Sequence, residues 1–346
     1  MAGNHGMRRY RGLKRTHNNQ DLGPLVQHEM NRCIQCYRCA RYYQEYSGYR
    51  DLGVMGSASR VYFGRRRSGV LESPFSGNLT DICPTGVYTD KPSRYFGRRW
   101  DYERRPTICI HCSLGCGLTA SARYRRVVRH EARFNPAVNG HFICDRGRYA
   151  YTYASADGRP RQAMINGKPA DITDGMATAR EALQRAVERN GTGSVAVVAS
   201  SRCSLETLAA VRHSCRQNGW IGPATVHTGR QASNLKTAID CLTPELAVSM
   251  NDLSAAHDVL VVGADPLNEA PMLALALRQV RRRGGRVTVI DPRKIELPFE
   301  FEHWAVSPID LTTVLKALLH QIEESQAAFV PSADVDDFPV EVLAKR

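Results

Sequence analysis

The sequence predicts a loop-rich α+β region followed by an α/β domain with a doubly wound parallel sheet. From residue 1 to about 150 the chain is rich in Arg, Tyr, Gly and Asn and has few long amphipathic periods, which predicts the first part. From residue 194 onward apolar strands alternate with helices, a pattern typical of a parallel sheet covered by helices. With 346 residues the chain is long enough for two or three domains.

Eight of the eleven cysteines lie in the first part and form two groups of the same kind. In each group two or three residues separate three leading cysteines, and a fourth cysteine follows at a distance. The groups are Cys33, Cys36, Cys39 with Cys83, and Cys109, Cys112, Cys116 with Cys144. Three thiolates in one tight loop plus a distant partner are the ligand plan of a cubane iron–sulfur cluster. The spacing therefore predicts two 4Fe–4S clusters with these eight ligands.

The contexts of the two distant cysteines favour loops. Cys83 precedes Pro84, which cannot continue a helix, and Cys144 follows a short apolar run and opens a stretch that predicts a turn.

Zinc is the alternative for the cysteines, but structural zinc sites usually have two separated cysteine pairs. Disulfides fit the spacing poorly and the amino terminus resembles no secretory signal, so we expect a reducing compartment. The remaining Cys203, Cys215 and Cys241 are interpreted as small buried hydrophobic residues without chemistry.

The net charge of +13 comes mainly from arginine, and most arginine runs flank the cysteines. We interpret them as groups that face acidic partner subunits or offset the anionic clusters. Nucleic acid is the alternative, although no recognised nucleic-acid motif accompanies the charge. No run of about eighteen apolar residues occurs, so no membrane-spanning helix is expected.

The elements after residue 150 follow in order. A hairpin is predicted around Asn166-Gly167, over 161–165 and 169–172. Asp174 is predicted to cap a helix that ends at Asn190-Gly191. The later elements are a strand over 195–199, a helix over 204–218, a strand over 259–262, a helix over 270–283 and a strand over 287–290. Turns with Asp-Pro follow the last two strands, at the sheet edge where open α/β folds bind ligands.

Three segments around the first cysteine group carry a resemblance to a known family. They are residues 28–39 (HEMNRCIQCYRC), 75–79 (FSGNL) and 82–87 (ICPTGV). They closely resemble the large iron–sulfur subunit (the G subunit) of bacterial NADH:quinone oxidoreductase, respiratory complex I, and the similarity extends over most of the chain. The resemblance implies that the first group holds a cluster on the electron path between flavin and quinone. It also implies that the second group holds a cubane set off from that path.

The α/β part resembles the molybdopterin oxidoreductase fold, to which formate dehydrogenases also belong. The loop that ligates the metal in those enzymes corresponds to residues 225–230, which contain no thiolate, and Cys241 lies too far along. We therefore expect no molybdopterin and interpret this domain as a scaffold and docking surface. His227 is interpreted as an ordinary histidine rather than a ligand.

The resemblance implies three domains: a first cluster region over 1–100, a second 4Fe–4S domain over 101–157, and a partial molybdopterin oxidoreductase-like domain over 158–346. Compared with the family, the chain lacks a leading two-iron ferredoxin domain and a cluster motif of one histidine and three cysteines. It also stops after one α/β lobe. We therefore expect a chain truncated at both ends, with an α/β domain that is incomplete at its C-terminus.

The predicted function is electron transfer in complex I, with no catalytic residue on this chain. The predicted partners are the NADH/flavin-binding subunit and the quinone-proximal iron–sulfur subunits, on the cytoplasmic side of the bacterial inner membrane, without nucleic acid. One alternative is a component of a molybdopterin-dependent formate dehydrogenase or an NAD-linked hydrogenase. The other is a zinc-containing nucleic-acid-binding protein.

Four basic residues near the ligands in sequence are expected to raise the cluster potentials, because positive charge stabilises the reduced, more anionic cluster. Ordinary surface salt bridges are the alternative role for them. The four are Arg32, Arg38, Lys91 and Arg146.

Overall fold

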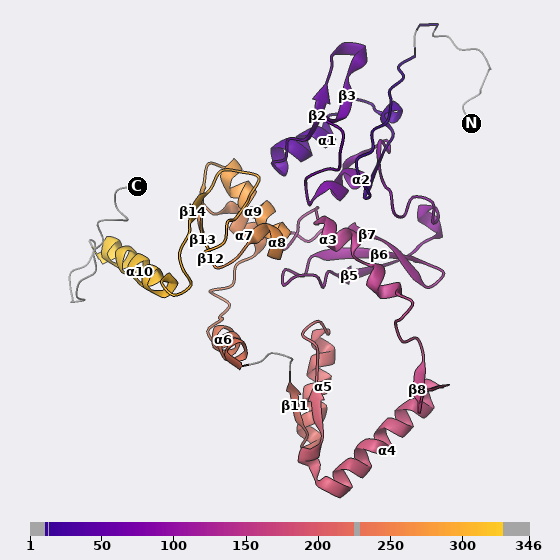
Figure 1. Ribbon diagram of the computed structural model, residues 1–346, viewed down its shortest axis with the longest axis vertical. Coiled ribbons are helices and arrows are strands. Elements are labelled where there is room, and N and C mark those ends of the chain that lie inside the picture. The colour runs from indigo at the N-terminus through magenta and orange to yellow at the C-terminus, as the bar shows by residue number, and fades with distance from the viewer. Residues whose placement is uncertain (1–10, 13, 225–228, 328–346) are drawn as a thin grey trace. The chain divides into compact units, whose positions relative to one another are not determined.

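The computed structural model describes residues 11–12, 14–224 and 229–327 (Figure 1). The chain divides into two compact units. The first contains the described residues up to Ala150 together with those from Ser249 onward, and the second is Tyr151–Val248. Each unit is described by itself.

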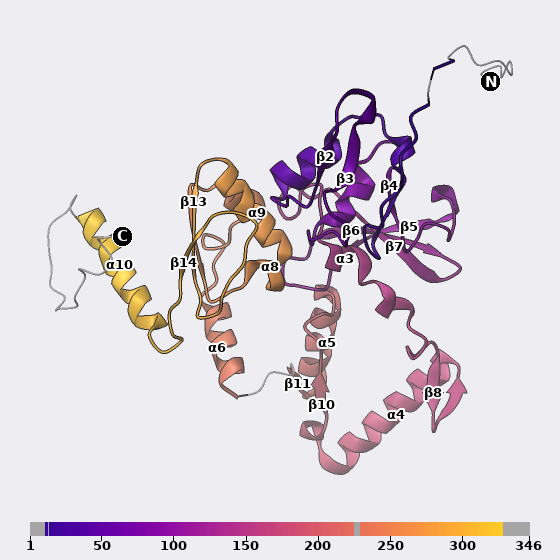
Figure 2. The ribbon, with the colours of Figure 1, turned by 45° about the horizontal axis from the view of Figure 1, so that its top comes forward.

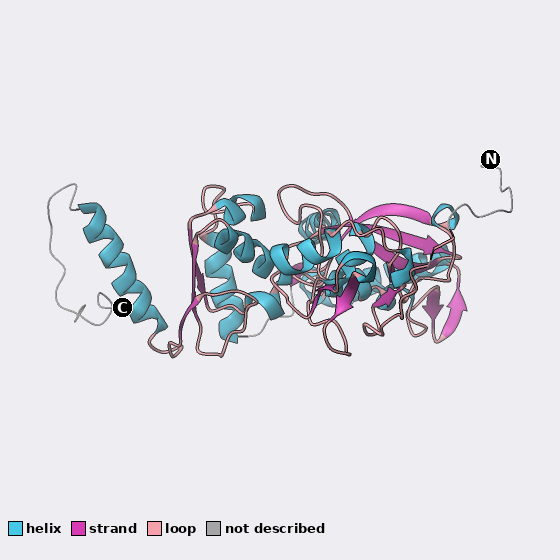
Figure 3. Ribbon diagram, turned by 90° about the horizontal axis from the view of Figure 1, so that it is seen from above, coloured by secondary structure: helices cyan, strands magenta, loops and turns pink. Residues whose placement is uncertain are grey.

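The first unit begins with short strands in two antiparallel pairs. Strand β1 (Val26–His28) pairs with β4 (Tyr88–Asp90), and β2 (Leu52–Met55) pairs with β3 (Tyr62–Arg65). Loops connect these strands and the short helices over much of the region (Figure 3), as the sequence predicts. The helices are α1 (Arg38–Ala40) and α2 (Leu79–Ile82), and a π-helical turn at Arg41–Tyr46 follows α1.

Aromatic side chains make the core of this region. The rings of Tyr43, Phe63, Phe75 and Tyr88 are buried together with Leu52 and Leu79. The core therefore surrounds the chain segments that carry the cysteines of the first group.

A three-stranded antiparallel sheet follows, which the sequence analysis did not predict. Its strands are β5 (Glu103–Ile108), β6 (Gly117–Arg123) and β7 (Arg126–Ala132). Tyr124 and Arg125 form the tight turn between β6 and β7, both with positive φ (51° and 62°), as a two-residue hairpin turn of the primed type requires. Helix α3 (Asp145–Tyr149) comes next in the chain.

The rest of the first unit is an α/β layer with a parallel sheet in the order β12-β13-β14, of which Figure 2 labels β13 and β14. The strands are Asp258–Val262, Arg286–Ile290 and Glu302–Trp304. Helices α7 (Met250–Ala255), α8 (Pro266–Glu269), α9 (Pro271–Arg282) and α10 (Leu311–Ala327) accompany them. The predicted strands over 259–262 and 287–290 and the helix over 270–283 are confirmed.

Helix α9 joins this sheet to the cysteine-bearing region. One side of the helix places Leu277 and Val280 against the buried strand residue Val289. The other side contributes Met272 and Leu275 to the core around the cysteines. Such a helix is apolar on two faces because it is covered on both.

The second unit starts with the predicted hairpin, β8 (Ala163–Ile165) with β9 (Lys168–Ala170). Helix α4 (Ile172–Asn190) follows, and its cap is Asp171, whose carboxylate accepts a hydrogen bond from the Thr173 N–H. The prediction of Asp174 as the cap was therefore wrong, because the helix begins earlier and Asp174 lies in its first turn.

The remaining elements of the second unit are α5 (Leu205–Asn218), α6 (Gly229–Asp240) and the parallel strands β10 (Ala196–Val198) and β11 (Ile221–Ala224). The β10–β11 pair and the β12–β14 sheet are separate. Across the described ranges, no helix is long and apolar enough to cross a membrane.

Candidate metal centres

The first three cysteines lie on a loop that passes twice through left-handed backbone. Gln35 has a φ of 57° and Tyr37 a φ of 61°, which cost on the order of 1 kcal/mol each for residues other than glycine. The Gln35 N–H donates to the Cys33 sulfur at 3.3 Å, and the Tyr37 ring contacts Phe63 edge-on with centroids 5.0 Å apart. These contacts hold the turns that bring the three thiols to one side of the loop.

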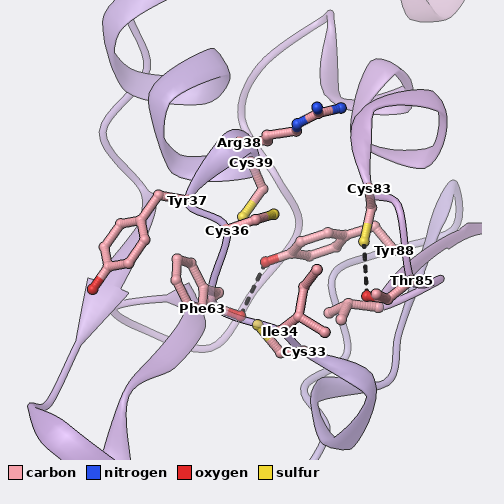
Figure 4. A pocket seen from close by; sticks show the side chains of 11 residues that line it. Cys33, Ile34, Cys36, Tyr37, Arg38, Cys39, Phe63, Cys83, Thr85 and Tyr88 are labelled. Atoms are coloured by element: carbon pink, nitrogen blue, oxygen red, sulfur yellow. Dashed lines mark hydrogen bonds between the residues drawn. The ribbon is translucent and has the colours of Figure 1, made fainter.

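Cys33, Cys36, Cys39 and Cys83 line one pocket. Figure 4 shows their side chains around the rings of Phe63 and Tyr88. Cys83 comes from the end of α2, which Pro84 stops as the sequence predicts. The structure thus brings together the four predicted ligands of the first group, in surroundings that are mainly apolar.

The thiols of the first group differ in acidity. Burial, together with the nearby thiols of Cys33 and Cys83, raises the pKa of Cys39 to about 12. Burial also tends to raise the pKa of Cys83, but hydrogen bonds from the backbone N–H groups of Tyr88, Thr85 and Val87 and from the Thr85 hydroxyl outweigh it, so this pKa is lowered. Cys83 therefore becomes a thiolate more readily than Cys33 and Cys39, whose pKa values burial raises.

This donor set fits an iron–sulfur cluster. Crowded, buried thiols repel one another when ionised, and iron cations would offset that charge. N–H groups aimed at a sulfur, as at Cys83, are the second contacts that tune such clusters. Among the described residues, no three His, Cys, Asp or Glu side chains are grouped so as to hold a single metal ion.

The second group is built on the loop between β5 and β6. Cys109 follows β5 and Cys116 precedes β6, and the Cys109 N–H donates to the Cys116 carbonyl at 2.9 Å, closing the loop that carries Cys112. Cys144 caps helix α3, and its sulfur accepts a hydrogen bond from the Gly147 N–H at 3.4 Å. The predicted turn at Cys144 is thus the start of a short helix.

The four sulfurs of the second group are also close together. Burial, together with repulsion from Cys109 and Cys112, raises the pKa of Cys116 to about 12 and that of Cys144 to about 11. Gly147 approaches the sulfurs so closely that an added Cβ would lie 3.2 Å from the Cys109 sulfur. The same chemical argument therefore fits this set to a second cluster.

Buried and partly buried hydrogen bonds connect the chain segments of the two distant cysteines. The Asp145 carboxylate accepts from the Ser76 N–H at 3.0 Å, from the Ser76 hydroxyl at 2.7 Å and from the Gly77 N–H at 2.7 Å. The Asn78 side chain donates to the Ile143 carbonyl at 2.7 Å and accepts from the Ile143 N–H at 3.2 Å.

Arg148 is the largest fully buried side chain of the described residues. Its Nη2 donates to the Asp81 carboxylate at 2.6 Å and to the Asn78 amide oxygen at 3.0 Å. We name the Asn78, Asp81, Asp145 and Arg148 side chains the polar network, in which Asn78 and Arg148 are buried, Asp145 is half-buried and Asp81 is exposed. Sequence reasoning missed it because its members bond residues more than sixty positions apart, although a buried charge is costly and needs such partners.

The four basic residues predicted to tune the clusters differ in their contacts. Arg32 pairs with Glu29 at 2.6 Å, and Lys91 pairs with Asp21 at 3.1 Å. Arg146 donates to the Asn268 carbonyl at 2.6 Å, and its charge opposes the burial that raises the pKa of Cys109.

Arg38 lines the first pocket and has no carboxylate within ion-pair distance in the described part of the chain. Arg38 and Arg146 therefore keep an uncompensated charge beside the cysteines.

The other predicted residues have mixed outcomes. Cys215 is buried as predicted, but Cys203 and Cys241 are exposed, because they lie in turns next to α5 and α6. His227 and the rest of residues 225–228 lie outside the described residues.

The two Asp-Pro turns have structural roles. Asp265 caps α8 by accepting from the Asn268 N–H at 3.2 Å. Asp291 pairs with Arg293 at 2.8 Å, and Arg293 also pairs with Glu269 at 3.0 Å.

Three family models match successive parts of the chain. They are the ferredoxin-like domain of NADH-quinone oxidoreductase subunit 3 over residues 23–89, the molybdopterin oxidoreductase Fe4S4 domain over 102–156, and molybdopterin oxidoreductase over 174–328. The first match contains the first cysteine group and the second match contains the second group. The chain thus has ferredoxin-like and molybdopterin oxidoreductase domains, and these support 4Fe–4S clusters as its cofactors.

Curated relatives agree with these matches. The chain is 44% identical to the G subunit of NADH-quinone oxidoreductase from Pseudomonas fluorescens over 282 residues, which are 80% of this chain and 30% of the relative. It is 42% identical to the same protein from Escherichia coli K12 over 286 residues, again 80% of this chain and 30% of the relative. The chain is related to the G subunit of NADH-quinone oxidoreductase. The resemblance seen around the cysteines is therefore confirmed, and the chain spans about 30% of the length of the curated relatives it matches.

Proposed function

We propose that this chain transfers electrons through two 4Fe–4S clusters as part of an NADH:quinone oxidoreductase. The observation that carries the proposal is the gathering of two sets of four thiols, each in a domain that matches an iron–sulfur family. The first set is Cys33, Cys36, Cys39 and Cys83, and the second is Cys109, Cys112, Cys116 and Cys144. The chain has no catalytic residue of its own in this proposal.

A bound 4Fe–4S cluster supplies one-electron oxidation and reduction without bond-making chemistry. The thiolates of this chain would hold the iron. Phe63 and Tyr88 line the first pocket beside the buried Cys39, while N–H groups stabilise the anionic sulfur of Cys83. Arg38 would stabilise the reduced state through its uncompensated charge.

The proposed partners are the NADH/flavin-binding subunit and the quinone-proximal iron–sulfur subunits of the complex, on the cytoplasmic side of the bacterial inner membrane. Nucleic acid is not a partner in this proposal. We further propose a first cluster region over 1–100, a second over 101–157, and a doubly wound molybdopterin oxidoreductase-like domain over 158–346 that binds no pterin.

A redox titration followed by electron paramagnetic resonance tests the function. Protein purified without oxygen should show two separate cluster signals, of which Cys83→Ala removes one and Cys144→Ala the other. Arg38→Gln should lower the midpoint potential of the first signal and leave the second unchanged, whereas Arg216→Gln, an exposed change in the second unit, should alter neither. A single signal that survives both cysteine changes would contradict the proposal.

One competing function is favoured by a specific observation. The match of residues 174–328 to molybdopterin oxidoreductase also suits a pterin enzyme of the formate dehydrogenase kind. Molybdenum or tungsten bound to the purified protein would support that function instead.

A further inference from the structure

Four large aromatic side chains lie exposed on the first unit, between β4 and the tip of the β6–β7 hairpin. Tyr95 is 87% exposed, Trp100 76% and Tyr124 85%, and Phe96 is exposed as well. Three of the rings carry a guanidinium on one face: Arg94 over Tyr95 at 5.2 Å, Arg98 over Trp100 at 5.4 Å and Arg123 over Tyr124 at 4.8 Å. Several large aromatic rings exposed near one another are typical of an interaction site.

We name these four rings and the three arginines over them the aromatic–arginine surface. Arg123 donates to the Phe96 carbonyl at 2.5 Å, and the Tyr102 hydroxyl donates to the Gly97 carbonyl at 3.0 Å. The contacts fix the hairpin tip against residues 94–102, so the exposed rings are held in place rather than displayed on independent loops.

A basic groove continues this surface down to the first cysteine group. Cys83 forms part of its wall. The groove is also lined by four arginines, which are Arg38, Arg99, Arg104 and Arg129. The two carboxylates of the groove are already paired, Glu131 with Arg104 at 2.5 Å and Asp81 with Arg129 at 3.3 Å.

Positive charge therefore remains available to a ligand. Residues 94–105 and 123–131 together contain nine arginines and three carboxylates.

We propose that the aromatic–arginine surface docks an acidic protein that carries a redox centre. Trp, Tyr and Arg are the residues that dominate protein–protein binding energy, and the guanidinium fork suits carboxylates. One electron would pass between the first cluster and the centre of the partner, oxidising one and reducing the other, with no bond made or broken. This step rests on the proposed function of the first cysteine group.

Protein is favoured over nucleic acid as the occupant because the groove leads to a sulfur ligand. A redox protein bound in the groove would place its own redox centre near Cys83, where an electron can be transferred. Nucleic acid carries no redox centre. Excess positive charge also speeds encounter with an acidic protein.

Binding of an acidic two-iron ferredoxin with a fluorescent label tests the proposal. The probe is titrated with the cluster-loaded chain in about 20 mM and about 300 mM salt, which bracket weak and strong screening. Arg99→Glu and Trp100→Ala should each weaken binding about tenfold or more at low salt, as for central residues of an interface. Both side chains are exposed, and the cluster absorbance checks that each variant is intact.

Arg216→Glu in the second unit is the matched control, since it makes the same charge change on an exposed helix. It should leave the affinity within about twofold of wild type. If the control weakened binding as much as the two test variants do, the proposal would be overturned, because the change in net charge alone would then explain the weaker binding. Unchanged binding of the ferredoxin by both test variants would also overturn the proposal. So would binding of single-stranded DNA of about 20 nucleotides that is tighter than binding of the ferredoxin and that the same two variants abolish. Iron content is measured separately, so a failure of the proposed electron-transfer function is distinguishable from a failure of docking.

Discussion

Gly77 shows how tightly the segment before Cys83 is packed. An added Cβ would lie 2.5 Å from Cδ of Arg148 and 2.8 Å from Cε2 of Tyr149. Arg148 cannot retreat, because it is fully buried and bonded to Asp81.

We therefore expect Gly77→Ala to lower the free energy of unfolding by about 1–3 kcal/mol, as overpacking does. Urea denaturation measures the change. The matched control is Gly158→Ala, whose added Cβ meets nothing within 4 Å and should change stability by less than about 0.5 kcal/mol. Equal stability of wild type and Gly77→Ala would show that this contact is not tight.

His28 is a buried histidine that the fold keeps neutral. Its Nδ1 accepts from the Gln20 N–H at 3.1 Å, so the proton is on Nε2, which donates to the Phe63 carbonyl at 3.0 Å. Burial lowers the pKa of His28 to about 4 from 6.5, although the bond to Phe63 opposes this. Protonation would turn Nδ1 into a second donor facing an N–H.

The sign of the pH effect follows from this lowered pKa. The stability that neutral His28 provides is fully present above pH 6.5 and is lost as the pH falls toward 4. Over that window we expect wild type to lose about 1.4 kcal/mol per pH unit more than His28→Gln, which does not titrate. Denaturation series at several pH values measure the difference, and parallel curves for the two proteins would mean that His28 is not buried as described.

At the level of elements, the polar network couples the two cysteine-bearing segments. Asp145, in the first turn of α3, accepts three hydrogen bonds from Ser76 and Gly77 in the segment that leads to Cys83. Charge-assisted bonds of this kind are stronger than neutral ones.

Asp145→Asn should therefore lower stability by about 2–4 kcal/mol, because the amide turns one acceptor into a donor that faces a donor. Hydrogen exchange should rise at the Ser76 and Gly77 amides. As a control, Asp171→Asn alters an exposed helix cap in the second unit and should cost about 1 kcal/mol or less. If Asp145→Asn left exchange in the 75–83 segment unchanged, the network would not be what holds this segment.

The elements that sequence reasoning predicted are those with a strong local signal. The alternation of apolar residues predicted the strand over 259–262 and the helix over 270–283, and the cysteine spacing predicted which thiols gather. The β5–β7 sheet was missed because its strands carry many arginines and bury few side chains. The left-handed turns at Gln35 and Tyr37 were missed because neither is a glycine.

At the scale of the whole molecule, packing joins segments that are distant in sequence. Gln279 of α9 donates to the Tyr46 carbonyl at 3.1 Å, and Met272 and Leu275 enter the core around the cysteines. No local sequence pattern specifies such contacts. An apolar helix face predicts that this face is buried, but it does not predict which part of the protein packs against it. The described residues from 249 onward thus belong to the same compact unit as both cysteine groups.

The central claim is that the two cysteine groups hold two 4Fe–4S clusters. Metal and acid-labile sulfide analysis of protein purified without oxygen tests it most directly, with iron, zinc, molybdenum and tungsten measured together. We predict about eight irons and eight sulfides per chain, and about four of each in Cys83→Ala and in Cys144→Ala. Zinc without sulfide would contradict the account, and so would an iron content per chain that is the same in both variants as in wild type.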